Sequence, residues 1–201
     1  ANARVMKILP TLDDRIQASP DPLLTALRFS LIANYIDVGV DKEFDWEIAL
    51  TEEKAQEELG GYTKLFQILD TGRSQVMILG DNAGEIGMDT LLVKQLQSLG
   101  AEVTYVVRGA PILNDATLDD ARFVGMDRLC RVIASGADSP GTILSRCRPN
   151  FLQELHAAQI VISKGQGNFE SLHGRLPGIF FALKVKCPVV GRLTGFPVRT
   201  S

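Results

Sequence analysis

The sequence predicts an α/β fold in which an N-terminal helical region precedes a doubly wound, mainly parallel sheet. Up to about Leu69 the apolar residues recur at the spacing of a helix face, and β-branched runs are absent. After residue 72 the pattern changes to short apolar runs that end in glycine, with helical patterns between them. Such alternation is typical of parallel strands joined by right-handed crossovers. We therefore expect a helical cap region over residues 1–70 and a Rossmann-like α/β domain over residues 71–201.

The helical region is predicted to contain several helices separated by loops. The segment SPDP at 19–22 predicts a break followed by a helix start, because proline fits a first turn and aspartate caps it. The segment TEEK at 51–54 has a pattern like a capping box and predicts the start of another helix.

Four apolar runs predict strands that are covered on both faces. They are VMILG at 76–80, VTYVVRG at 103–109, RVIASG at 131–136 and IVISKG at 160–165. An apolar stripe over 85–100 that stops at Gly100 predicts a helix between the first two. IFFALKV at 179–185 and PVVGRL at 188–193 are interpreted as two further strands, with a buried helix as the alternative for IFFALKV.

Composition excludes several classes of function. A net charge of -3 gives no electrostatic reason to expect nucleic acid or an anionic membrane surface as a partner. No apolar run approaches the roughly 18 residues of a membrane helix, and the first residues lack the apolar centre of a signal peptide, so a cytoplasmic protein is expected. The three cysteines are widely spaced and form no C-x-x-C pair, which gives no indication of a disulfide or of a thiolate zinc site. The sequence carries no signal of an oligomeric state.

Polar and small residues follow three of the predicted strands, in GDNAGE at 80–85, RGAPILNDAT at 108–117 and SKGQGNFE at 163–170. In open α/β sheets, ligands bind beyond the carboxyl ends of the strands. If the first two strands are neighbours, Asp81 and Asp115 lie side by side and repel each other unless a cation sits between them. With the amide oxygen of Asn82 they form an all-oxygen set, which suits magnesium or manganese.

A phosphate site is the interpretation that combines these features. Lys164 supplies a positive charge, and the neighbouring glycines, Gly165 among them, let backbone amides approach an anion. The reaction that follows is phosphomonoester hydrolysis. Asp81 is either a metal ligand only or the nucleophile that forms a phospho-aspartate, and both roles stay open. Asn34, near the end of a helix in the cap region, is a candidate for substrate contact, with a helix-ending asparagine as the alternative.

The strings GDNAGEIGMDTLL, RGAPILNDAT and ISKGQGNFESL resemble the damage-control phosphatases, first catalogued as domain of unknown function 89. A weaker similarity over DPLLTALRFSLIANYID extends the resemblance from Asp21 to Leu172. It implies a metal-dependent phosphatase for small phosphorylated metabolites such as sugar phosphates, damaged ones included. The metals it implies are manganese, cobalt, nickel or magnesium.

The resemblance also implies roles for individual residues. Asp81, Asn82 and Asp115 correspond to the metal ligands, and Lys164 corresponds to a lysine that contacts phosphate. We expect Glu85, which matches the first motif, to take part in catalysis with Asp81 and Lys164. The remaining residues expected to bind substrate, besides Lys164, are Asn34, Asn114, Gly165 and Asn168. Microbial members of the family usually begin with a segment that carries a C-x-x-C pair, and because this sequence starts without it, no thiol site is carried over.

Two other functions stay open at the level of sequence. One is an S-adenosylmethionine-dependent carboxyl methyltransferase, because glycine-rich turns after a first strand also suit adenosyl ligands and relatives have been described in this way. It would need no metal and would favour an acidic residue at the end of the second strand. The other is a noncatalytic metal- or metabolite-binding module, which a buried and fully coordinated metal would favour.

Overall fold

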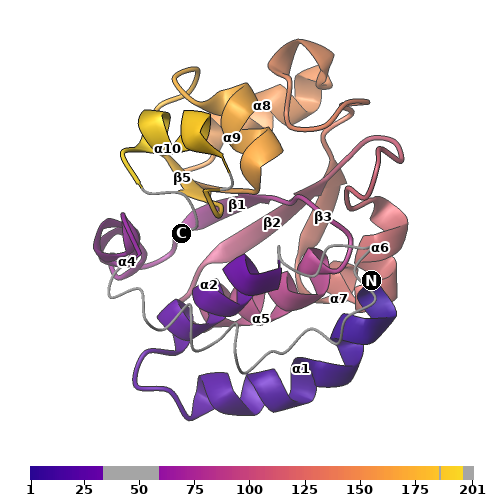
Figure 1. The fold of residues 1–201 in the computed structure, drawn as a ribbon. Coiled ribbons are helices and arrows are strands. Elements are labelled where there is room, and N and C mark those ends of the chain that lie inside the picture. Colours follow the sequence, from indigo (N-terminus) through magenta and orange to yellow (C-terminus); the bar gives the residue numbers. More distant parts are fainter. Residues whose placement is uncertain (34–58, 186, 197–201) are drawn as a thin grey trace.

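Five parallel strands form a single sheet with the order β3-β2-β1-β4-β5 (Figure 1). The computed structural model describes residues 1–33, 59–185 and 187–196. The first three strands form one half of the sheet, and β4 then pairs with the other side of β1. The strand order therefore reverses between β1 and β4, which is the topological switch point of the sheet. This is the order of a doubly wound Rossmann-like fold, as the sequence predicts. The strands are β1 (Gln75–Leu79), β2 (Glu102–Val107), β3 (Arg131–Ala134), β4 (Ile160–Lys164) and β5 (Ile179–Ala182).

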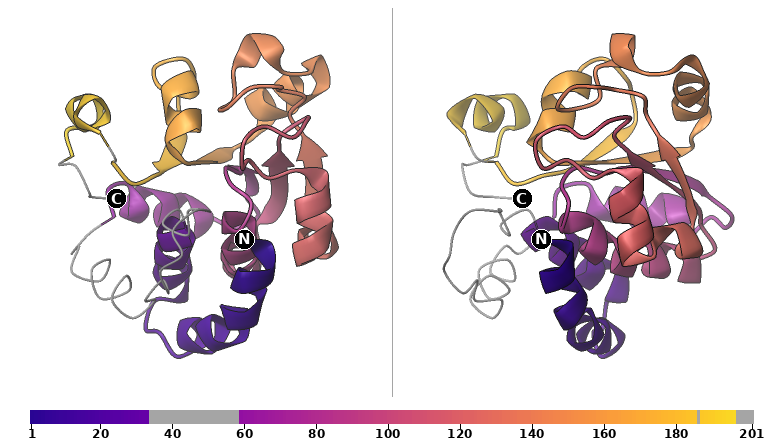
Figure 2. Two further views of the ribbon diagram at one scale, coloured as in Figure 1. Left: turned by 45° about the vertical axis from the view of Figure 1, so that its right-hand side comes forward. Right: turned by 90° about the vertical axis from the view of Figure 1, so that its right-hand side faces the viewer.

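Helices cover both faces of this sheet. On one face lie α5 (Glu85–Ser98), α6 (Leu118–Val124) and α7 (Met126–Leu129), with α1 (Asn2–Gln17) and α2 (Pro22–Ile32) packed outside α5. On the opposite face lie α8 (Pro149–Ala157) and α9 (Gln166–Leu172), with α10 (Pro188–Thr194) beside them (Figure 2). A short helix, α4 (Tyr62–Leu69), precedes β1, and a 3-10 turn, Leu144–Arg146, precedes α8.

Apolar residues on the two faces of the strands form two separate cores. Val76, Ile78 and Tyr105 pack toward α5, in a cluster that also contains buried apolar residues of α1, α2 and α4. Met77 and Leu79, which alternate with them along β1, pack toward α8 and α9. Because both faces are covered, the strands read as continuous apolar runs in the sequence.

The N-terminal helices pack on the sheet domain through α5. This helix is buried over almost its whole length, from Glu85 to Leu96 apart from Lys94, because the sheet covers one side of it and α1 and α2 cover the other. The predicted start of α2 is confirmed, since the Asp21 side chain accepts a hydrogen bond of 2.9 Å from the Leu24 amide. The capping-box segment at 51–54 lies outside the described residues, and a domain boundary at residue 70 stays a prediction.

One predicted strand is wrong. The segment PVVGRL at 188–193 forms helix α10, whereas IFFALKV does supply a strand, β5, which pairs with β4. Pro188 occupies the first turn, where a missing amide hydrogen costs nothing, and Gly195, with φ of 76°, follows the last turn as a left-handed cap. These two residues mark a helix, and a run of so few apolar residues does not distinguish the two periodicities.

Cys130, Cys147 and Cys187 are free thiols. Across the described residues, no helix is long and apolar enough to cross a membrane.

Candidate active site

The exits of β1 and β2 are joined by their backbones. Asn82 and Asp115 form an isolated antiparallel bridge, and the Ala116 amide donates a hydrogen bond of 2.8 Å to the Asp81 carbonyl. Because β1 and β2 are parallel neighbours, their carboxyl ends meet at the same edge of the sheet. The structure therefore brings Asp81, Asn82 and Asp115 together, as expected for strands in this order.

The side chain of Asp81 fits against a glycine at the exit of β4. Gly165 has φ of +77°, and a Cβ atom there would lie 1.9 Å from Asp81 Oδ2. The residue must therefore be glycine for two reasons, a left-handed backbone and the close approach of a carboxylate. Its amide donates a hydrogen bond of 3.0 Å to the Ala182 carbonyl, so the predicted role of Gly165 in holding an anion would need this amide to change partner.

The first residues of α1 hold the same two loops in place. Asn2 accepts a hydrogen bond of 2.6 Å from the Gly84 amide through Oδ1. Its Nδ2 donates one of 2.7 Å to Asp120, which closes the capping box of α6 with Thr117. One side chain thus links the loop after β1 to the segment after β2.

The donor set fits a hard divalent cation. The side chains of Asp81 and Asp115 are 13% and 6% exposed, so they lie at the rim between core and solvent. Both carboxylates pair with one guanidinium group, that of Arg108, so they converge on the same positive charge. No cluster of three or more His, Cys, Asp or Glu side chains suited to a metal occurs in the described part of the chain. The expected set differs from such a cluster because its third ligand is an amide.

Arg108 lies directly behind these carboxylates and is 3% exposed. Its Nε donates a hydrogen bond to Asp115 Oδ2, and its terminal nitrogen Nη2 lies 3.7 Å from Asp81 Oδ1. The other donors reach Thr142 Oγ1 at 3.2 Å and Asn168 Oδ1 at 3.1 Å. A buried arginine therefore forms the inner wall of the candidate metal site.

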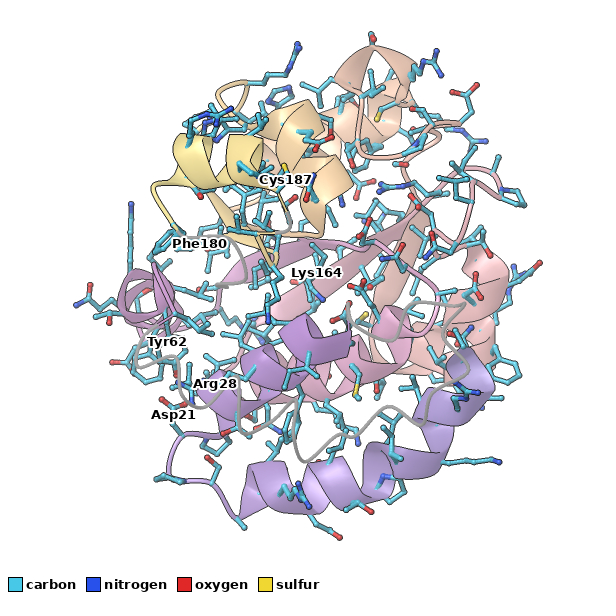
Figure 3. The ribbon with its side chains drawn as sticks, viewed as in Figure 1. Asp21, Arg28, Tyr62, Lys164, Phe180 and Cys187 are labelled. Atoms are coloured by element: carbon cyan, nitrogen blue, oxygen red, sulfur yellow. The ribbon has the colours of Figure 1, made fainter. Side chains whose placement is uncertain are left out.

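Lys164 lies in a second buried network, on the side of the sheet that faces α2 and α5. Its Nζ is 2.9 Å from Asp89 Oδ1, 3.5 Å from Glu85 Oε2 and 3.1 Å from the Ser30 carbonyl. Figure 3 shows the place of Lys164 in the fold. Lys164 is 1% exposed, so a direct contact with phosphate would require it to leave these partners. The structure places it as a cation between two buried carboxylates, and the predicted phosphate contact stays a prediction.

The rest of this network surrounds Asp89. Ser30 donates a hydrogen bond of 2.5 Å to Asp89 Oδ1, and Tyr105 donates one of 2.7 Å to Asp89 Oδ2. Helix α2, helix α5 and strands β2 and β4 are thereby linked through one carboxylate. Burial raises the pKa of the Tyr105 hydroxyl, and the charge of Asp89 raises it further, so Tyr105 stays a hydrogen-bond donor.

Glu85 connects this network to the expected metal ligands. Its Oε1 accepts a hydrogen bond of 2.6 Å from the amide nitrogen of Asn82, which also donates one of 3.1 Å to Asp81 Oδ2. Burial raises the pKa of Glu85 to about 7, with Lys164 opposing the shift. For Lys164, burial lowers the pKa, but Asp89 and Glu85 outweigh it and raise the pKa above its ordinary value. The lysine is therefore charged.

Asn168 is fully buried and has partners on both ends of its amide. Its Oδ1 accepts hydrogen bonds from Arg108 and from Thr142 Oγ1, the latter at 2.7 Å. Its Nδ2 donates to the carbonyls of Lys164 at 2.8 Å and Gly80 at 3.1 Å. The structure thus places Asn168 as a link between the ends of β1 and β4 and Arg108, and its predicted contact with substrate stays a prediction.

The structure describes one of the two remaining predicted substrate residues, Asn114. Asn114 is partly exposed in the loop after β2, where its carbonyl accepts a hydrogen bond of 2.7 Å from the Ala83 amide. Asn34 lies outside the described residues. Leu113, next to Asn114, is 89% exposed and has φ of 47°, the only non-glycine residue with positive φ among those described.

Sequence reasoning missed several residues of the two networks. Arg108 ends an apolar strand in the same way as Lys164, so the rule that singled out Lys164 applied to it as well. Asp89 follows Glu85 by four positions, which places both acids on one face of a helix whose surroundings are apolar. Ser30, Tyr105 and Thr142 give no such signal, because only the packing of distant segments brings them to the site.

Comparison with known proteins gives a consistent family relationship. A model described as the damage-control phosphatase ARMT1-like domain matches residues 1–201. A protein named damage-control phosphatase from Archaeoglobus fulgidus is 35% identical, over 98% of this chain and 70% of its own length. Damage-control phosphatase PH1575 from Pyrococcus horikoshii is 32% identical, over 83% of this chain and 59% of its own length. The chain therefore spans about two thirds of the length of these relatives.

A solved structure shows the same fold. The crystal structure of a DUF89 family protein, PH1575 of Pyrococcus horikoshii, superposes with a TM-score of 0.81 and 29% sequence identity. The likeness covers 99% of this chain and 71% of that one. The mixed α/β architecture with its parallel sheet is thus shared with a member of this family.

Proposed function

We propose that this chain, which belongs to the damage-control phosphatase ARMT1-like family, is a metal-dependent phosphatase that acts on small phosphorylated metabolites. The observation that carries the proposal is the convergence of Asp81, Asn82 and Asp115 at the carboxyl edge of β1 and β2. Relatives at 32% and 35% identity are named damage-control phosphatases, which supports the reaction class.

The residues that would hold the metal are Asp81, Asn82 and Asp115. When bound there, a divalent ion such as manganese, magnesium, cobalt or nickel would supply charge stabilisation for a phosphoryl group and lower the pKa of a bound water. The partial exposure of the Asp81 side chain, 13%, supports an open site, which catalysis needs and a purely structural metal does not.

The residues of the chain then have separate tasks. Asp81 either holds the cation only or attacks phosphorus as a nucleophile, and Gly165 leaves the space that either role needs. Glu85 orients the Asn82 amide through a hydrogen bond of 2.6 Å. Lys164, charged and fixed between Glu85 and Asp89, balances the negative charge behind the site. This arrangement is preorganised for a reaction that brings in an anion.

The substrate class follows from the charge and the architecture of the site. Strand exits of an open α/β sheet bind small ligands, and a divalent ion at that edge selects a phosphoryl group. We propose sugar phosphates and related phosphomonoesters, damaged ones included, as substrates.

The alternative, an S-adenosylmethionine-dependent methyltransferase, has less support from the site. An adenosyl ligand favours an acidic residue at the end of the second strand, to hold its ribose. Here β2 ends at Val107 and is followed by Arg108, a buried cation, while Asp115 comes only after a loop and pairs with that arginine. The convergence of two carboxylates on one point instead favours a cation site.

The test is phosphate release from a panel of sugar phosphates and p-nitrophenyl phosphate. The protein is treated with a chelator, and manganese, cobalt, nickel and magnesium are then added back one at a time. We expect release only after a metal is restored, and a loss of at least about 100-fold in Asp81→Ala and Asp115→Ala. Asp119→Ala is a matched control, because that side chain is 91% exposed and pairs with Arg122 on α6. Undiminished turnover in either site variant would remove the metal assignment.

A further inference from the structure

Arg108 is a buried charge among the described residues of the site, and the proposed reaction gives it no task. Its guanidinium contacts both carboxylates of the proposed metal set, through Nε to Asp115 and at 3.7 Å to Asp81. We propose that Arg108 is a positioning residue: in the absence of metal its charge takes the place of the cation and keeps Asp81 and Asp115 together. This inference rests on the proposed function, because it assumes that the two aspartates bind a metal.

The charges of the site require such a group. Two carboxylates that converge at a mostly buried edge repel each other, and a buried charge without a partner is costly. The side chains of Asp81 and Asp115 are 13% and 6% exposed, so water screens them poorly. An arginine stays charged at any accessible pH, which makes it a constant counter-charge whether or not metal is present.

Arg108 is held from behind, so it does not depend on the aspartates for its position. Thr142 and Asn168 accept hydrogen bonds from its two terminal nitrogens, at 3.2 Å and 3.1 Å. The amide of Asn168 is in turn fixed to carbonyls at the ends of β1 and β4. The guanidinium is thereby fixed to the sheet by partners other than the two aspartates.

Direct hydrogen bonds from Arg108 do not saturate the two carboxylates. Arg108 engages Asp115 through one carboxylate oxygen, Oδ2, and lies beyond direct hydrogen-bond distance of Asp81 at 3.7 Å. The Asp81 Oδ2 atom accepts its hydrogen bond of 3.1 Å from the Asn82 amide instead. It follows that Arg108 matters most to the metal-free protein, and that a bound metal takes over most of its electrostatic task.

The test compares thermal unfolding of the wild-type protein and of Arg108→Gln, each with a chelator and with excess Mn²⁺. We expect Arg108→Gln to lower Tm by on the order of 10 °C in chelator, and Mn²⁺ to reduce this deficit to less than half. Arg108→Lys keeps the charge without the forked geometry, so its deficit in chelator should be smaller. Arg131→Gln is the control, because Arg131 pairs with Glu154 at the surface with 59% of its side chain exposed, and its effect should not depend on metal.

The outcomes separate this inference from the proposed function. A wild-type protein whose Tm does not respond to Mn²⁺ would remove the proposed metal site, and the inference with it. A wild-type response combined with an equal Arg108→Gln deficit in chelator and in Mn²⁺ would overturn the inference alone and leave Arg108 a structural residue. If Arg108→Gln does not fold in either condition, the same comparison is made with Arg108→Lys, where an equal deficit again overturns it.

Discussion

At the scale of single residues, the site depends on side chains that fit against backbone with no space to spare. If any residue but glycine stood at position 165, its Cβ atom would lie 1.9 Å from Oδ2 of Asp81. The glycine is thus part of the binding site although it offers no ligand. Its position at the end of an apolar strand in SKGQG was visible in the sequence, but its neighbour was not, because β1 and β4 are far apart along the chain.

Gly165→Ala should therefore damage the site more than an equivalent change elsewhere. Gly178→Ala is the matched control, since Gly178 has a similar φ of +75° and nothing within 4 Å of the added Cβ. Both variants bear the strain of a left-handed alanine, about 1–2 kcal/mol, but only Gly165→Ala displaces Asp81. We expect Mn²⁺ to raise Tm by the same amount in Gly178→Ala and in the wild-type protein, and by much less in Gly165→Ala. Equal metal-induced shifts in the two variants would show that Asp81 does not depend on this contact.

At the scale of helices and strands, the sequence predicts those elements that carry a clear apolar pattern or a clear signal at their ends. The first four strands follow from short apolar runs that end in glycine, and α2 follows from its aspartate cap and first-turn proline. Helix α10 does not, because its apolar residues are few and consecutive, and the correct indications were Pro188 and Gly195 at its two ends. The proximity of Asp81 and Asp115 could be predicted, because each follows one of two neighbouring parallel strands. The burial of the Arg108 and Lys164 side chains could not, because it depends on packing that no local sequence pattern encodes.

A second prediction concerns how α4 is attached to α2. The hydroxyl of Tyr62 donates to both carboxylate oxygens of Asp21 at 2.7 Å, and the same carboxylate caps α2 through the Leu24 amide (Figure 3). Burial raises the pKa of Tyr62, and Asp21 raises it further, so the hydroxyl stays a donor. Asp21→Ala should lower the free energy of unfolding by about 1–3 kcal/mol and Tyr62→Phe by about 1 kcal/mol.

Because both changes break one shared interaction, the double variant should lose less than the sum of the single losses. Urea denaturation of the three variants measures the difference. Strictly additive losses would mean that the tyrosine and the cap act independently, contrary to the geometry.

At the scale of the whole molecule, one buried charge network holds the layers together beneath the site. Lys164 on β4 contacts Asp89 and Glu85 on α5 and the Ser30 carbonyl on α2, and Tyr105 on β2 reaches the same Asp89. Elements from both halves of the sheet and from the outer helical layer meet there. The network therefore couples the stability of the fold to the position of Glu85, which orients the expected ligand Asn82.

Loss of Lys164 should consequently affect the entire fold. Lys164→Met removes the buried cation that pairs with Asp89 at 2.9 Å, so we expect the free energy of unfolding in urea at pH 7 to fall by about 3–5 kcal/mol. Lys94→Met is the control, because Lys94 pairs with Asp13 at 2.7 Å but is 43% exposed. Such surface pairs contribute at most about 1 kcal/mol. A loss in Lys164→Met as small as that in the control would show that the buried network does not stabilise the protein.

The proposed function depends on the binding of a divalent metal by Asp81, Asn82 and Asp115 at the edge of β1 and β2. The most direct measurement is anomalous diffraction from crystals grown with Mn²⁺, which locates the ion without reference to any activity. We expect an anomalous peak bounded by oxygens of these three side chains, with Arg108 still behind Asp115. An occupied manganese site elsewhere, with no peak between these residues, would contradict it.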